Sequence, residues 1–254
     1  MNNSPKAVKL QSVTSACQLC HARELCMASC LNENELERFD NIVGHRSPME
    51  RGERLFMAGE KIKSIYVLHS GSVKTYIESV NGDNQITGFH FPGDVIGIHG
   101  VENKVHTDTV EALETSSVCE LRFDNLEAIV ETFPSLQQEL MRYVFREMNH
   151  EQEQLMVLGK LTADRRLAHF LLDISSRLKD HGLSESKFNL MMTRNDIANY
   201  LGLAIETVSR VLTRFQKQEI IEVDRRSVHI RDFSRLRAVY QDADLATDNT
   251  SCSA

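Results

Sequence analysis

The stretch that decides the fold is residues 193–216, TRNDIANYLGLAIETVSRVLTRFQ. Thr193 can cap a first helix, and Gly202 permits the left-handed turn that reverses the chain within about three residues. Leu203 fills this turn, and a second helix with a regular apolar face follows. The apolar positions of the two helices are Ile197, Ala198, Leu201, Val208, Val211, Leu212 and Phe215. This spacing favours a helix-turn-helix over a plain helical hairpin with a solvated charged face.

The opposite face of the second helix is polar. A recognition helix enters the major groove of DNA with its N-terminal residues toward the base edges. Arg210 can contact guanine O6 and N7 together, Glu206 can accept from cytosine N4, and Ser209 can pair with either kind of group. An acid that faces polyanionic DNA makes sense only if it contacts a base. The residues of this helix predicted to bind DNA are Glu206, Ser209, Arg210, Thr213 and Arg214.

The flanks of this motif predict a winged helix-turn-helix domain. A helical pattern runs from Ala163 to Lys179, and IIEV and VHIR form a short hairpin around residues 224–227. Arg225 and Arg226 at the hairpin tip are predicted to contact phosphate rather than bases. Residues 155–238 contain 15 Lys and Arg against 10 Asp and Glu. This basic excess is modest and supports DNA binding only weakly.

A long helix is predicted ahead of this domain, from Pro134 to about Leu158. Apolar residues recur along it at alternating steps of three and four, which is the pattern of a coiled-coil seam. The alternative is a core helix that packs against its own domain. The predicted dimerisation residues are Met141, Val144, Met148, Glu151, Leu155 and Leu158, with one acid among them.

The sequence pattern changes over residues 43–123, where short runs of alternating apolar and polar residues are separated by Gly, Pro and Asn turn signals. Many short strands at near-regular spacing predict an antiparallel roll or barrel. Asn81-Gly82-Asp83 is a good hairpin turn, because Asn and Gly tolerate positive φ. Asn32 and Glu35 resemble a capping box that opens a helix from Glu33 to about Ile42. The fold class is therefore α+β.

Composition narrows the class of protein. The 254 residues suit two medium domains, with 41% hydrophobic and 26% charged residues and a net charge of −7. No apolar run approaches the roughly 18 residues of a membrane span. The segment MNNSPKAVKLQS lacks the apolar core of a secretory signal, so we expect a cytoplasmic protein. With no nucleophile–base pair and no G-x-x-x-x-G-K phosphate loop, we do not expect an enzyme.

Four of the six cysteines lie within fourteen residues: the full set is Cys17, Cys20, Cys26, Cys30, Cys119 and Cys252. Because cytosolic thiols stay reduced, such a group predicts metal binding before disulfides. A four-cysteine zinc site is one alternative, although zinc sites usually carry Cys-x2-Cys pairs and only one pair is present.

A strand roll, a long helix and a winged helix-turn-helix, in that order, resemble the CRP/FNR regulators over roughly residues 17–235. The stretches SGSVKTY, GDNQITGFHFPGD, ALETSSVCEL and IANYLGLAIETVSRVLTRFQK look closely like the FNR branch, including its Anr-type members. The pattern Glu-x-x-Ser-Arg at 206–210 matches this branch, with Ile205 where Val is usual. The segment GIHGVENKVHTDTVEAL after Gly93-Asp94 has no arginine for a nucleotide phosphate, so no cyclic nucleotide is expected.

The resemblance implies an oxygen-sensing regulator with one [4Fe–4S] cluster per subunit, held by Cys17, Cys20, Cys26 and Cys119. Without oxygen, the cluster promotes homodimerisation and binding to double-stranded DNA at a TTGAT-N4-ATCAA-like palindrome, which activates or represses genes of anaerobic metabolism. Cys30 is an extra thiol that could replace Cys26 or Cys119, Cys252 is taken as incidental, and His21 as a solvated loop residue. A regulator that senses another small effector is the alternative.

The resemblance also implies further partners and boundaries. The tip at Gly82 and Asp83 is similar to a surface that family members present to RNA polymerase, and an acid matching Glu151 is found in FNR-like proteins.

The implied organisation is a cysteine-rich cluster-binding segment at 1–32, a β-roll of the jelly-roll-like, cyclic-nucleotide-binding type at 33–133 and a dimerisation helix at 134–160. The winged helix-turn-helix follows at 161–238 and a disordered tail at 239–254.

Overall fold

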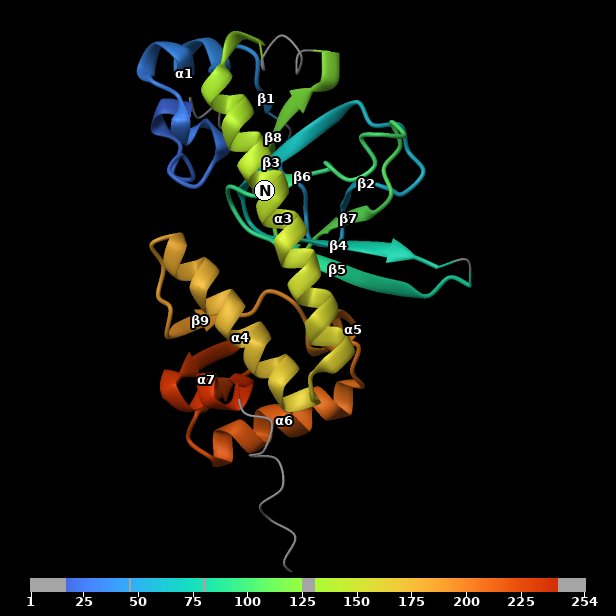
Figure 1. The fold of residues 1–254 in the computed structure, drawn as a ribbon, viewed down its shortest axis with the longest axis vertical. Helices are drawn as coiled ribbons and strands as arrows, with labels where there is room; N and C mark the ends of the chain where they lie inside the picture. The colour runs from blue at the N-terminus through green and yellow to red at the C-terminus, as the bar shows by residue number, and fades with distance from the viewer. Residues whose placement is uncertain (1–16, 46, 80, 125–130, 242–254) are drawn as a thin grey trace, which may run out of the picture.

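The computed structural model describes residues 17–45, 47–79, 81–124 and 131–241. A strand-rich N-terminal half and a mainly helical C-terminal half are joined by one long helix (Figure 1). Within these ranges, no helix combines the length and the apolar character needed to cross a membrane.

The cysteine-rich segment folds into short helical pieces above the roll. It contains two 3-10 helices, η1 (Cys17–Leu19) and η2 (Met27–Cys30), and the helix α1 (Glu33–Asp40). The predicted capping box is confirmed, because the Asn32 side chain accepts from the Glu35 N–H and the Glu35 carboxylate accepts from the Asn32 N–H, both at 3.0 Å. The helix ends two residues earlier than predicted.

The predicted antiparallel roll is confirmed as two four-stranded sheets that face each other, with orders β1-β8-β3-β6 and β2-β7-β4-β5. Their core includes Leu68, Val73 and Val110, which are fully buried. The β4–β5 hairpin projects from the roll (Figure 1), and Gly82 at its tip has φ of +86°. The strands are β1 (Gly44–His45), β2 (Arg54–Phe56), β3 (Ser64–Ser70), β4 (Val73–Glu78), β5 (Asn84–His90), β6 (Val95–Ile96), β7 (Thr109–Ala112) and β8 (Ser117–Arg122).

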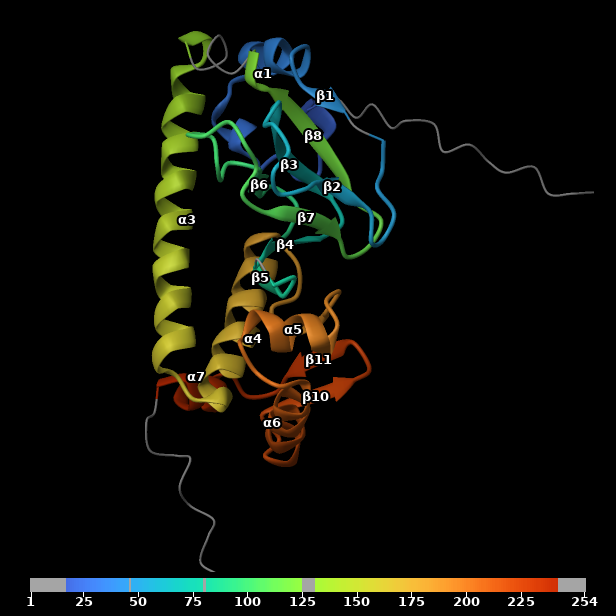
Figure 2. The same cartoon turned by 90° about the vertical axis from the view of Figure 1, so that its right-hand side faces the viewer.

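The long helix α3 (Pro134–Lys160) is fixed to the roll near its N-terminal end. Phe133 and Leu136 are fully buried there, and the Tyr143 hydroxyl donates to the Val95 carbonyl at 2.8 Å. In Figure 2, α3 runs along one edge of the molecule, and the roll and the C-terminal half both lie on the same side of this helix. The helix therefore has a long side that its own chain leaves uncovered.

The C-terminal half is a helix-turn-helix with a three-stranded wing of order β10-β11-β9. Gly202 in the turn has φ of +59°, as its predicted role requires. Two elements escaped prediction, the edge strand β9 and the final helix α7. The elements are α4 (Ala163–Asp180), β9 (Lys187–Asn189), α5 (Arg194–Tyr200), α6 (Ile205–Lys217), β10 (Ile221–Asp224), β11 (Ser227–Ile230) and α7 (Phe233–Gln241).

The disordered tail was predicted to begin at residue 239, but this boundary is wrong, because the helix α7 extends to Gln241. Leu236 is fully buried, and Arg165 on α4 donates to the Tyr240 carbonyl at 2.8 Å. Residues 239–241 are thus held as helix against α4, and the rest of the predicted tail, including Cys252, lies outside the described residues.

The two halves meet where β5 contacts α5. Asn199 accepts from the Ile86 N–H at 2.6 Å, and Lys74 on β4 pairs with Asp196 at 3.0 Å. On α4, the partly buried Arg177 donates to the carboxylate of Asp94 at 2.5 Å. These polar contacts set the position of the helix-turn-helix against the roll.

Thr193→Ala is expected to lower the free energy of unfolding by about 1 kcal/mol. Thr193 begins α5 with a capping box, in which its hydroxyl accepts from the Asp196 N–H at 3.1 Å and its own N–H donates to the Asp196 carboxylate at 2.8 Å. Urea denaturation followed by circular dichroism measures the change. Thr193→Ser keeps the hydroxyl and is the control; equal losses in both variants would contradict the capping role.

Candidate functional site

Cysteines from two distant segments line a single cavity. Cys17, Cys20 and Cys26 come from the N-terminal segment, and Cys119 comes from β8, so the structure brings together the four residues predicted as ligands. Their role as ligands stays a prediction. The walls between them are mainly apolar, and Arg23 is the one cationic lining residue among the described residues. The other lining residues are Ala28, Phe39, Val43, Val67 and Leu121.

Local structure explains how each sulfur reaches the cavity. Cys17 begins η1, and its N–H donates to the Asp40 carboxylate at the end of α1 at 2.9 Å. Cys26 has extended backbone just before η2. Cys119 lies opposite Val67 and His45 in the sheet, with its sulfur 3.8 Å from the His45 Nδ1. Three sulfurs therefore come from a short loop and the fourth from a fixed strand.

The cavity disfavours charged sulfur. Burial is the main cause that raises the pKa of Cys26 to about 11 and of Cys119 to about 12, and it raises the pKa of Cys17 further, with help from the neighbouring Asp40. All three thiols are therefore neutral at pH 7. A thiolate here requires a bound positive centre, since thiolate is the form that ligates metals.

Among the described residues, Cys30 and His21 do not line this cavity. The Cys30 thiol donates to the Met27 carbonyl at 3.2 Å, and its side chain is near Ser135 and Glu139 of α3. His21 is exposed, in agreement with a solvated loop residue. The geometry therefore favours Cys26 and Cys119 over Cys30 as ligands.

The sulfur spacing bears on the zinc alternative. Four thiolates around one tetrahedral zinc ion, at about 2.3 Å each, lie about 3.8 Å apart. In the described part of the chain, no three cysteine sulfurs lie within 4.8 Å of one another. A cubane cluster separates its ligand sulfurs more widely, because each binds a different iron. The choice between a cluster and a zinc ion stays a prediction.

The second candidate surface is the outer face of α6. Arg210, Thr213 and Lys217 are exposed there, and Glu206 is exposed on the first turn. The Arg210 guanidinium is 3.4 Å from the Thr207 hydroxyl, and Arg194 on α5 is 3.4 Å from the Ser209 hydroxyl. Lys217 and Arg194 belong to this cationic surface but were not predicted, because they lie outside the recognition-helix pattern. A shallow hollow on this face is lined by Ser209, Arg210, Thr213, Arg214 and Lys217.

Three other residues predicted to contact DNA have specific environments. Arg214 forms an ion pair with Asp164 at the start of α4, so its guanidinium is already engaged. Arg225 and Arg226 are exposed in the β10–β11 turn, where Arg225 has φ of +53°. The wing thus presents two cations beside the recognition helix, as predicted.

Comparison with known proteins agrees with this arrangement. Residues 165–239 match the Crp-like helix-turn-helix domain, and residues 46–133 match the cyclic nucleotide-binding domain. The chain is 42% identical to the transcriptional activator protein Anr of Pseudomonas protegens, over 91% of this chain and 96% of Anr. It is 43% identical to the fumarate and nitrate reduction regulatory protein of Yersinia pestis, over 85% and 86% of the two chains.

The chain belongs to the FNR-type regulators of the CRP/FNR family. The solved structure of FixK2 from Bradyrhizobium japonicum has the same fold, with a TM-score of 0.72 and 29% identity over 80% of this chain and 99% of FixK2. As a member of this family, the chain is a transcription regulator with a helix-turn-helix that binds DNA.

In this FNR-type chain, the acid of the Gly93-Asp94 segment links the roll to the DNA-binding half. The Asp94 carboxylate accepts from the Phe91 N–H at 2.9 Å as well as from Arg177. Arg177 also donates to the Phe89 carbonyl at 2.8 Å. Asp94 is therefore engaged within the chain, and the expected lack of cyclic-nucleotide binding stays a prediction.

The cysteine segment packs directly on the start of α3. Met27, Ala28 and Leu31 are buried in one cluster with Leu136, and the partly buried Leu140 joins them. The cysteine segment and the first turns of α3 thus share one apolar core.

Further along α3, large apolar side chains are exposed, which argues against the alternative of a core helix. Of the predicted seam, Met141 is 48%, Met148 50% and Leu155 71% exposed, while Val144 and Leu158 are partly covered. Phe145 and Met156 are also exposed and were not predicted. Large exposed apolar side chains on one helix are typical of an interaction surface, and dimerisation through α3 stays a prediction.

Proposed function

We propose that this chain is an oxygen-responsive transcription regulator in which Cys17, Cys20, Cys26 and Cys119 hold one [4Fe–4S] cluster per subunit. The observation that carries the proposal is the convergence of these four thiols on one cavity. When bound, the cluster supplies a link between the N-terminal segment and β8 that oxygen can break. The names of the relatives, which refer to fumarate and nitrate reduction, support control of anaerobic metabolism.

The chain's own residues connect this site to dimerisation. Ligation of the cysteine loop keeps Met27 and Leu31 against Leu136 and so orders the first turns of α3. The exposed apolar stripe of α3 then packs against the same stripe of a second subunit, since a twofold dimer uses one self-complementary surface. Loss of the link loosens this end of α3 and weakens the homodimer.

The dimer is the form that reads DNA. Two α6 helices reach half-sites about one helical turn apart, which suits a TTGAT-N4-ATCAA-like palindrome. The β4–β5 tip with Gly82 and Asp83 is exposed and projects from the roll, so it is available for contact with RNA polymerase. Bound in this way, the protein activates or represses transcription according to where the palindrome lies.

Anaerobic purification tests the cofactor. The expected product is brown, contains iron and sulfide at about four of each per subunit, as one [4Fe–4S] cluster requires, and bleaches in air with loss of palindrome binding. A colourless protein with one zinc ion per subunit that binds the palindrome equally in air would overturn the proposal.

Glu151→Ala is expected to shift the cluster-free protein toward dimer, by about 1 kcal/mol or roughly fivefold. The Glu151 carboxylate is 55% exposed and lies in the predicted seam, 3.7 Å from His99 of its own subunit. In the dimer, two such carboxylates approach each other and repel, which keeps association weak enough to be reversed. Sedimentation of the air-exposed protein measures the shift.

Glu153→Ala is the matched control for this variant, because Glu153 is an exposed acid on the same helix that pairs with His169 at 3.0 Å. It should leave the equilibrium near that of the parent. An unchanged equilibrium in Glu151→Ala would rule out Glu151 as the brake on dimerisation.

A further inference from the structure

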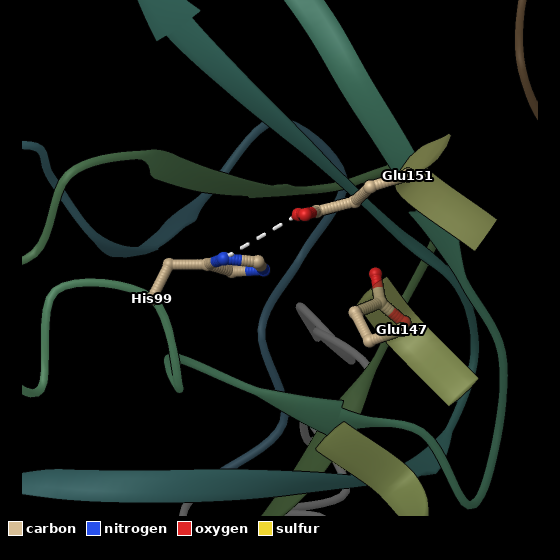
Figure 3. Close-up of side chains that lie close together, drawn as sticks. All are labelled: His99, Glu147 and Glu151. Atoms are coloured by element: carbon tan, nitrogen blue, oxygen red, sulfur yellow. Dashed lines mark ion pairs between the residues drawn. The ribbon is translucent and has the colours of Figure 1, made fainter. Parts of the chain in front are cut away.

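A histidine and two glutamates meet between the roll and α3, away from the cysteines. Figure 3 shows the His99 ring pointing toward the Glu151 carboxylate, with the Glu147 carboxylate beside them. One ligand atom from each of the three residues lies within 4.8 Å of the other two. In the described part of the chain, this is the one group of three or more His, Cys, Asp or Glu residues that approach so closely.

The backbone around these three residues is constrained. Glu147 and Glu151 are one turn apart on α3, so their side chains leave the same face of the helix. His99 follows β6 in a loop between Gly97 and Gly100, which both have positive φ. A Cβ at Gly100 would lie only 2.0 Å from the Val105 carbonyl oxygen, so the loop is closed tightly on itself. The imidazole is therefore presented from a constrained loop to a rigid helix.

Two carboxylates in the described part of the chain, Glu147 and Asp108, have oxygens without hydrogen-bond partners. Glu147 is half-buried, and burial raises its pKa; the structure gives it no hydrogen bond or ion pair with any described residue. Asp108 is only 4% exposed, and its Oδ1 has no hydrogen-bond partner among the described residues. Burial raises the pKa of Asp108, and the charge of His99 acts in the opposite direction.

Unpartnered buried oxygens beside a histidine have a known use in metal sites. A ligating histidine usually donates its second ring N–H to a carboxylate, which fixes the orientation of the ring. Asp108 has the chemistry for this role, since it is buried and its Oδ1 has no hydrogen-bond partner among the described residues. A buried carboxylate without a partner otherwise costs stability, so an occupant that recruits it explains its presence.

We propose that His99, Glu147 and Glu151 bind a divalent metal ion of the Mn²⁺ or Fe²⁺ class. One neutral imidazole and two carboxylates carry a charge of −2, which a divalent cation balances. Carboxylate and imidazole donors suit these ions, whereas thiolates select softer ones. The half-exposed Glu151 can adjust its side chain to bring its oxygen to bonding distance, and water completes the coordination.

Occupancy of this site would also act on dimerisation, an extension that rests on the proposed function of α3. A cation bound by Glu151 cancels the charge that opposes association of the two helices. Divalent metal and cluster would then act on the same helix from two different places, since the cysteine segment packs at its first turns.

Titration of Mn²⁺ into the full chain, followed by the loss of the electron paramagnetic resonance signal of the free ion, tests the site. Mn²⁺ is chosen because it disfavours thiolates, so the result does not depend on the cysteines. The parent should bind one Mn²⁺ per subunit. His99→Ala and Glu147→Gln should each weaken binding by at least about tenfold, the loss already expected for an outer-shell partner.

Glu139→Gln is the matched control, an identical change on the same helix at an acid that pairs with Arg142. It should bind Mn²⁺ as the parent does. Thermal unfolding checks that each variant is folded. If Glu147→Gln is not folded, Mn²⁺ binding by His99→Gln tests the site instead. No saturable binding by the parent, or binding unchanged in the folded His99 variants, would overturn the site.

Sedimentation of the air-exposed protein with and without Mn²⁺ tests the extension. The parent should form more dimer with Mn²⁺, and His99→Ala should not respond. Binding without a change in dimer fraction would overturn the link to dimerisation. If instead Glu151→Ala leaves the metal-free equilibrium unchanged, the proposed seam is wrong, and the Mn²⁺ titration still decides the site separately.

Discussion

Replacing Cys119 with serine is expected to remove nearly all anaerobic cluster content and, with it, specific binding to the palindrome. Cys119 supplies the one sulfur that comes from a strand, and its place between β1 and β3 cannot be taken by a movable loop. A serine oxygen is harder than a thiolate and binds cluster iron poorly. Absorbance and iron content of the anaerobic protein measure the loss, and a mobility shift with the palindrome measures the consequence.

Cys17, Cys20 and Cys26 should respond in the same way, since all three line the same cavity. Cys30→Ser is the matched control, because the Cys30 thiol bonds to the Met27 carbonyl outside that cavity. It should retain the cluster and DNA binding. Loss of the cluster in Cys30→Ser, together with a dispensable Cys26, would show that the ligand set is assigned wrongly.

Much of the fold could be predicted because its signals are local. A capping threonine, a glycine with positive φ and an apolar face at helical spacing all act within a few residues, and the predicted Thr193 cap and Gly202 turn are both present. The strand β9 has three residues with one buried, Phe188, too short for an alternating pattern. The helix α7 has a single buried residue, Leu236, so its stability comes from α4 rather than from its own sequence.

The candidate sites depend on contacts that sequence spacing does not encode. Nothing local connects Cys119 to the N-terminal cysteines; that link came from the family resemblance, and the shared cavity now supports it. The pair of Arg214 with Asp164 joins residues fifty positions apart. His99 reaches Glu151 only because the roll folds back against α3. Long-range packing, rather than residue type, decides each of these contacts.

Arg210→Ala is expected to weaken binding to the cognate palindrome by about 2–6 kcal/mol per dimer. Loss of one bidentate contact to guanine costs about 1–3 kcal/mol, and a twofold dimer loses two of them. Arg210 is suited to this contact because it is exposed on the outer face of α6, and its nearest polar neighbour is the Thr207 hydroxyl at 3.4 Å. No carboxylate in the described chain pairs with it, so its guanidinium is free to reach a base.

The decisive comparison for Arg210 is between specific and unrelated DNA. Anaerobic titrations with the palindrome and with a scrambled duplex, at one salt concentration, give both affinities. Arg210→Ala should lose far more on the palindrome, because a base contact is absent from non-specific complexes. Arg225→Ala at the wing is the control: loss of a phosphate contact weakens binding to both DNAs about equally and lowers the salt dependence by about one counterion per subunit, or about two per dimer. Equal losses on both DNAs in Arg210→Ala would make it a phosphate contact, and base recognition would then rest on Glu206 and Ser209.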